Sequence, residues 1–144
     1  MVLDATSRAL LLPIAALVAW TFVMWAWMYV TRIPAIRNSK MKLDPSVPRG
    51  EQMALLPASV RWKADNYNHL MEMPTLFYAI AIIMALSGRA TPTDSWIAWG
   101  YVGLRVVHSI FQSTVNKIEV RFSLFFLSTV VLIVLTVRTL LALT

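Results

Sequence analysis

The sequence contains no cysteine and only two histidines among its 144 residues. Without cysteine the chain can form no disulfide, and it offers neither a thiolate nucleophile nor cysteine ligands for an iron–sulfur cluster. Two histidines argue against a four-ligand zinc cluster, so we expect no metal site. Charged residues are scarce as well, at 14% of the chain, whereas soluble domains average about a quarter. Together with 58% hydrophobic residues, this scarcity indicates a membrane protein.

Basic residues outnumber acidic ones by 13 to 7. They do not alternate with aromatic residues on a soluble face, so we expect no nucleic-acid partner and membrane lipids instead. The length suits one small bundle, and we expect a single domain over residues 1–144.

Four apolar segments follow one another, and we expect membrane spans at about 9–31, 66–88, 95–115 and 120–143. The second apolar run is too short alone, so its helix must also carry Asn68, His69 and Glu72 to the hydrocarbon boundary. The first run is longer than the core of a signal peptide, about 7–15 residues, so we expect it to be retained. Short later connections predict an all-α, up-down four-helix bundle.

The long connection at 32–57 contains several prolines, which predict a loop with one short helix at most. Basic residues gather in and beside it: Arg32, Arg37, Lys40, Lys42, Arg49, Arg61 and Lys63. The positive-inside rule therefore predicts that loops one and three face the cytosol and that both termini lie outside.

Arg105 stands in the middle of the third apolar segment. A charge near the bilayer centre costs at least about 3 kcal/mol, so such a residue usually faces a bundle interior or a polar cavity. At 100° per residue, its helical face also carries Tyr101, His108 and Gln112. A polar seam between helices and a buried site for an anionic ligand both explain this pattern.

A second polar stripe runs through the preceding segment and comprises Arg61, Asp65, Asn68 and Glu72, with His69 at its edge. By depth, we expect part of it to converge with the third and fourth spans in the cytosolic half: Asn68, Glu72, Arg105, His108, Gln112 and Arg121. Arginines hold carboxylates bidentately, and Glu72 would accept a hydrogen bond from an ammonium or amide group. In the simpler alternative, Glu72 pairs with Arg105 and neutralises it.

The run RWKADNYNHLMEMPTLFY at 61–78, followed by Arg105, His108 and Arg121, resembles the MAPEG family, the membrane-associated proteins of eicosanoid and glutathione metabolism. The resemblance covers the whole chain and is strongest to bacterial members. It implies a homotrimer of four-helix subunits in a bacterial inner membrane.

The resemblance also implies a site for glutathione, as co-substrate, in the cytosolic half between subunits. Arg121 matches the arginine associated with the thiolate, which makes it the catalytic candidate. The other implied binding residues are Asn68, Glu72, Arg105, His108, Gln112 and Arg37, with Arg32 as an alternative to Arg37. The implied activity is that of a glutathione transferase or peroxidase acting on lipophilic electrophiles.

The sequence departs from the family pattern at three positions. Ala64 stands where members carry an arginine, so Arg61 or Lys63 would have to replace it. Gln112 replaces a tyrosine, and Phe122 replaces a serine that some members carry. The missing tyrosine and serine favour an alternative, a non-catalytic lipid-binding or scaffold protein of the same fold. A small transporter or structural bundle is the third alternative.

Overall fold

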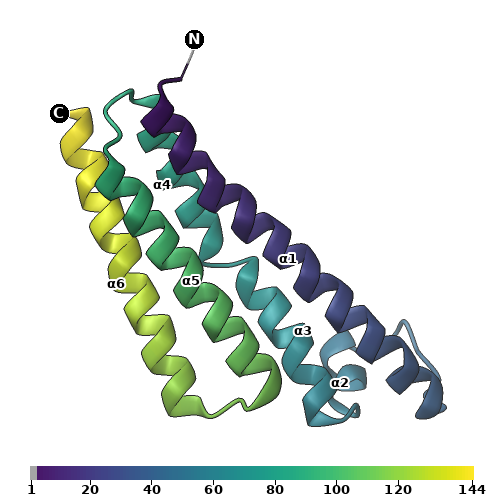
Figure 1. Cartoon of the computed structure of the whole chain (residues 1–144). Coiled ribbons are helices and arrows are strands. Elements are labelled where there is room, and N and C mark those ends of the chain that lie inside the picture. The colour runs from purple at the N-terminus through teal and green to yellow at the C-terminus, as the bar shows by residue number, and fades with distance from the viewer. Residues whose placement is uncertain (1–2) are drawn as a thin grey trace.

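The computed structural model describes residues 3–144, with only the backbone of Arg49. Within this range it contains six helices and no strand (Figure 1). They are α1 (Ala5–Asn38), α2 (Arg49–Ala54), α3 (Ala58–Leu70), α4 (Pro74–Leu86), α5 (Pro92–Thr114) and α6 (Ile118–Leu143).

The long helices lie side by side, while α2 is a single short helix between the ends of α1 and α3 (Figure 1). Helix α5 packs against α6, α1 and α3, and α4 packs against α1 and α6. The described chain therefore places α5 in the middle of the molecule, in contact with both α3 and α6. The hydrophobic core of the molecule is built from side chains of all the long helices and includes Leu17, Phe77, Tyr101 and Leu135.

Helix α1 begins at a side-chain cap, in which Asp4 accepts a hydrogen bond of 2.6 Å from the Ser7 backbone N–H. It does not end at residue 31. The prediction that the loop begins at Arg32 is wrong, because the helix continues through Pro34 to Asn38. Proline has a φ that suits a helix, and here it removes one backbone hydrogen bond without ending the turn.

The segment predicted as one helix over 66–88 consists of α3 and α4, separated by three residues, Met71–Met73. Pro74 starts α4, and it has no N–H to donate to the carbonyl of Leu70. The proline ring would also crowd that carbonyl, so an uninterrupted helix is disfavoured here.

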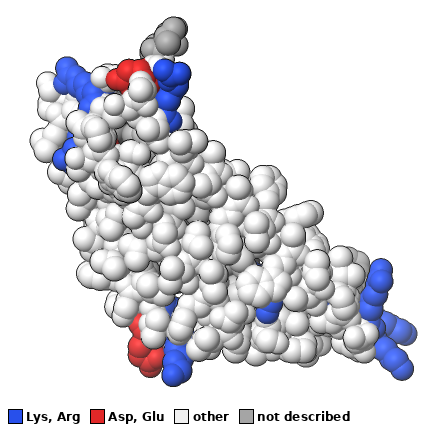
Figure 2. Space-filling view, viewed as in Figure 1, with Lys and Arg blue, Asp and Glu red and all other residues white. Residues whose placement is uncertain are grey.

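Among the described residues, three stretches are long and apolar enough to cross a membrane: Ala5–Asn38, Ala58–Leu86 and Ile118–Leu143. Helix α5 has 23 residues, which is enough to span, but its polar side chains lower its hydropathy. Charged side chains on the face in Figure 2 gather toward the two ends, and the broad middle is nearly uncharged.

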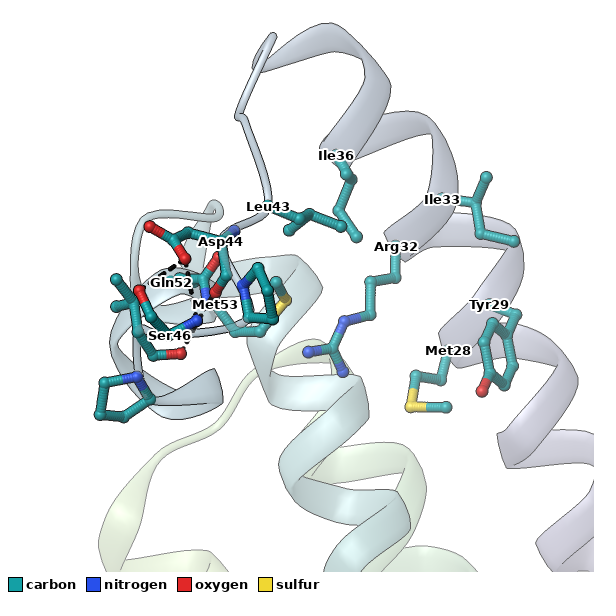
Figure 3. A pocket seen from close by; sticks show the side chains of 13 residues that line it. Met28, Tyr29, Arg32, Ile33, Ile36, Leu43, Asp44, Ser46, Gln52 and Met53 are labelled. Carbon is teal, nitrogen blue, oxygen red and sulfur yellow. Dashed lines mark hydrogen bonds between the residues drawn. The ribbon is translucent and has the colours of Figure 1, made fainter.

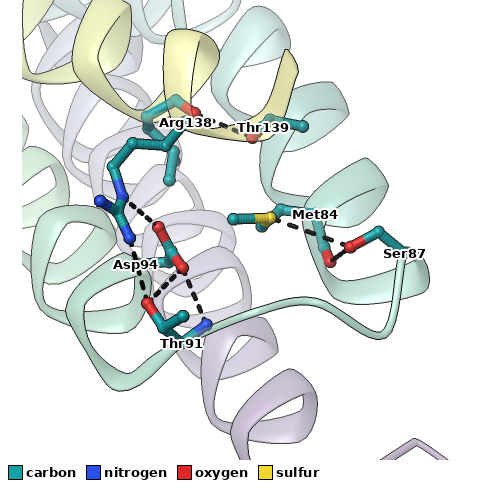
Figure 4. A network of polar contacts seen from close by, with 7 residues as sticks. Met84, Ser87, Thr91, Asp94, Arg138 and Thr139 are labelled. Atoms are coloured by element: carbon teal, nitrogen blue, oxygen red, sulfur yellow. Dashed lines mark hydrogen bonds and ion pairs between the residues drawn. The ribbon is translucent and has the colours of Figure 1, made fainter. Parts of the chain in front are cut away.

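An ion pair joins the start of α5 to the C-terminal part of α6 (Figure 4). Arg138 Nε donates to Asp94 Oδ1 at 2.6 Å, while Asp94 Oδ2 accepts from the backbone N–H and hydroxyl of Thr91. Asp94 is fully buried, so its charge is satisfied by three donors instead of water. This network caps α5 and ties it to α6.

Candidate functional site

Helix α5 carries its polar side chains into the interior of the molecule. The four residues of the stripe predicted from the sequence are all buried: Tyr101, Arg105, His108 and Gln112. Ser109 and Ser113 lie on the same buried side. The helix therefore presents a row of hydrogen-bonding groups where apolar side chains would ordinarily pack.

Arg105 is 1% exposed and has one hydrogen bond, from Nη2 to the backbone carbonyl of His69 at 3.1 Å. Its guanidinium also lies 5.9 Å from the centre of the Phe125 ring. In the described part of the chain, its Nε and Nη1 atoms are buried and have no hydrogen-bond partner. Because buried donors are nearly always paired, these two point to a partner outside the single chain.

The side chain of His69 is 24% exposed and packs beside the buried group. Its ring stacks on Phe125 at 5.2 Å and lies 5.3 Å from the ring of His108. Its Nδ1 pairs with Glu72 Oε2 at 3.0 Å. Glu72 itself is 66% exposed, and no ion pair joins it to Arg105 among the described residues. The alternative in which Glu72 directly neutralises Arg105 therefore does not fit this structure.

Helix α3 turns a different side inward than the one predicted. Its buried residues are Lys63, Asn66 and Leu70, whereas Asn68 is exposed. Both side-chain amide atoms of Asn66 are buried without a partner in the described chain. Sequence reasoning missed Asn66, although its spacing from Lys63 and Leu70, three and four residues, is that of one helical face.

Lys63 lies between α3 and the C-terminal end of α5. Its ammonium group donates to the carbonyls of Ser59, at 2.8 Å, and Ser113, at 3.3 Å. It also lies 5.1 Å from the ring of Trp27. These contacts occupy Lys63, so its role is to hold α3, α5 and α1 together.

Arg121 opens α6 and is half-buried. Its Nη1 donates to Asn116 Oδ1 at 2.7 Å, and its Nε is buried without a partner in the described residues. The same holds for Gln112 Oε1 and for the hydroxyls of Ser109 and Ser113. Donors and acceptors on α3, α5 and α6 thus remain open.

The remaining predicted residues lie elsewhere. Asn68, Arg61 and Asp65 line a cavity of about 610 Å³ between α1, α2 and α3, together with Arg32. Arg37 is exposed near the end of α1. The structure therefore divides the predicted site into a buried group around Arg105 and an open group around Asn68. No cluster of three metal-binding side chains occurs among the described residues.

The comparisons with known proteins return one finding. A family model described as the MAPEG family matches residues 10–141, which is nearly the whole chain. No curated protein and no solved structure matches.

Proposed function

The chain belongs to the MAPEG family, and on that premise we propose that this membrane protein is a glutathione-dependent transferase or peroxidase. It conjugates or reduces lipophilic electrophiles that reach it through the bilayer. The fourth membrane-crossing helix is α5, which makes the chain a four-helix bundle. The working unit is a homotrimer in a bacterial inner membrane, with loops one and three in the cytosol.

The observation that carries this proposal is a group of buried polar atoms around Arg105 that have no hydrogen-bond partner among the described residues. It includes three guanidinium nitrogens, two on Arg105 and one on Arg121, and the whole amide of Asn66. Leaving one such atom unsatisfied costs about 1–3 kcal/mol, so a chain that buries several of them gains most when a polar ligand arrives. A purely structural seam would be expected to satisfy its own donors.

Glutathione fits the chemistry of these residues. It carries two carboxylates, which Arg105 can bind by charge-assisted hydrogen bonds, and two amides, which suit Asn66 and Gln112. Glu72 is the acid beside the cluster, joined to it through His69, and it can accept from the ligand ammonium group. Since Arg105 is buried, the rings of His69 and Phe125 must shift to admit the ligand.

Arg121 acts on the thiol. A positive charge beside a thiol favours the thiolate, which is the nucleophile. In the transferase reaction the thiolate sulfur bonds to an electrophilic carbon, and the leaving group departs with its electron pair. His108 lies beside His69 and helps to shape the site. Arg37, which is exposed on its own chain, contributes from a neighbouring subunit.

The second candidate is a non-catalytic lipid-binding or scaffold protein. Its support is that Gln112 cannot supply a phenol and that Phe122 supplies no hydroxyl. In that case the open donors around Arg105 would meet polar groups of a neighbouring subunit.

Isothermal titration with reduced glutathione distinguishes the two candidates. Helix α3 offers a matched pair, because Asn66 is buried in the cluster and Asn68 is exposed two residues later. We expect Asn66→Leu to weaken binding at least about tenfold and Asn68→Leu to leave it nearly unchanged, since one charge-assisted or buried hydrogen bond is involved. No heat and no thermal shift with wild type at millimolar glutathione would reject the catalytic function and favour the scaffold.

A further inference from the structure

A cavity of about 690 Å³ lies at the C-terminal end of α1 (Figure 3), beside the 610 Å³ cavity, with which it shares Met28, Tyr29, Arg32 and Met53. One wall is the last part of α1, with Met28, Ile33 and Ile36, and the other is the segment 43–53. Arg32 projects from α1 into the space between them (Figure 3). The volume is within the range of small-molecule sites, about 300–1,000 Å³.

The opposite wall consists of the loop 43–48 and of residues of α2, and hydrogen bonds between the two fix its shape. The side chain of Gln52 accepts from the Asp44 N–H at 2.9 Å and donates to the carbonyls of Asp44, at 2.7 Å, and Val47, at 2.8 Å. The Asp44 carboxylate is used within the loop as well, because Ser46 donates both its N–H and its hydroxyl to it. These hydrogen bonds therefore hold the wall formed by segment 43–53 in place, and Leu43 and Met53 add apolar surface to it.

The cavity lies where the apolar part of α1 meets its basic part. The run Ala9–Thr31 contains no charge, and Arg32 follows immediately. From Met28 to Ile36 the helix rises about 12 Å, which is more than the headgroup region of one leaflet, about 5–8 Å, so this stretch covers the headgroups and the upper part of the acyl chains. Over residues 32–44 the sequence has four basic residues and one acid. This end of the molecule thus offers apolar surface and positive charge at the same level.

We propose that this cavity binds an anionic glycerophospholipid of the surrounding membrane. The headgroup phosphate lies at Arg32, whose planar guanidinium matches phosphate oxygens. The upper part of an acyl chain lies along Met28, Ile33 and Leu43. Positive charge next to the apolar run selects an anionic headgroup, and the apolar walls select a lipid over a soluble phosphate. The site is distinct from the cluster around Arg105 and does not depend on glutathione.

Native mass spectrometry can test the proposal on the purified full-length protein. The protein is equilibrated with equal amounts of phosphatidylglycerol and phosphatidylcholine of identical acyl chains, and the bound lipids are counted. We expect wild type to retain phosphatidylglycerol at least about tenfold better, because both lipids carry the phosphate but the Arg32 charge repels the quaternary ammonium of phosphatidylcholine. Arg32→Gln should lose this preference. Arg37→Gln removes the same charge from an exposed position outside the cavity wall, and it should keep the preference.

A second variant protects the test against misfolding of Arg32→Gln. Leu43→Trp fills the apolar side of the cavity and leaves Arg32 in place, so it should reduce retention of both lipids. Equal retention of the two lipids by wild type would overturn the proposal, as would an unchanged preference in Arg32→Gln. Displacement of phosphatidylglycerol by millimolar glycerol phosphate would also overturn it, because the occupant would then be a soluble anion.

Discussion

Replacing Arg105 by methionine should leave the ligand-free protein at least nearly as stable as wild type. Methionine fills a similar space without charge, so the change removes two buried guanidinium nitrogens that have no partner within the described chain. Relief of that desolvation is worth about 2–6 kcal/mol for the two atoms. The loss of the bond to the His69 carbonyl costs about 1.5–3 kcal/mol. The net effect therefore lies between a loss of about 1 kcal/mol and a gain of about 4.5 kcal/mol in the free energy of unfolding.

Arg138 provides the matched control because its bonds to Asp94 and Thr91 are already made. Arg138→Met removes the charge-assisted partner of the fully buried Asp94 carboxylate. It does not remove a desolvation penalty in return, as Arg105→Met does. We expect it to destabilise the protein by about 1.5–3 kcal/mol, a figure that allows for the 36% exposure of Arg138. The substitution by methionine should thus destabilise the protein clearly more at Arg138 than at Arg105.

The assay is thermal unfolding of the purified protein in detergent, with and without glutathione. A ligand at one hundred times its dissociation constant stabilises the native state by about 2.7 kcal/mol. Wild type and Arg138→Met should both gain this stabilisation, and Arg105→Met should lose it. If Arg105→Met lowers the ligand-free melting temperature as much as Arg138→Met does, the arginine has a structural partner and the reasoning is refuted.

Three further predictions concern Arg121, the assembly and the first loop. Arg121→Ala should reduce turnover with a halonitroarene about 10–150-fold while changing glutathione affinity little, and an equal thiolate absorbance and turnover in both proteins would reduce Arg121 to an interface anchor. Native mass spectrometry of the intact protein should show a trimer, and monomer alone would contradict it. The hydrogen bonds from Ser46 hold the pKa of Asp44 below its ordinary value. The stability that they give the folded loop is fully present when the pH is above the ordinary pKa, and it is lost as the pH falls through the lowered pKa. Hydrogen exchange in the first loop should therefore rise in strong acid, and Asp44→Asn should show faster exchange already at neutral pH.

The polar face of α5 could be predicted from the sequence because the third apolar segment has a clear contrast between its two sides. Arg105, His108 and Gln112 interrupt an otherwise apolar run at helical spacing, and all three are buried in the structure. The position of α6 followed from a long, mainly apolar run that contains no charged residue over 122–137. In both cases the signal was local and repeated over several turns.

The orientation of α3 could not be predicted in the same way. This helix has few apolar residues, so periodicity does not show which side is buried. Extending one helical stripe from Asn68 to Glu72 also assumed a continuous helix through the break at Met71–Met73. Asp94 and Arg138 are 44 positions apart in the sequence, so no local pattern predicts that they pair.

The break between α3 and α4 affects how this chain can evolve. In an unbroken helix, inserting one residue rotates everything beyond it by 100° and moves lipid-facing side chains into the interior. An insertion among the three non-helical residues before Pro74 need not rotate α4, since the proline begins a new helix there. Polar residues on α3 can therefore change spacing, and with it the ligand they suit, while α4 keeps the same apolar surface toward the membrane.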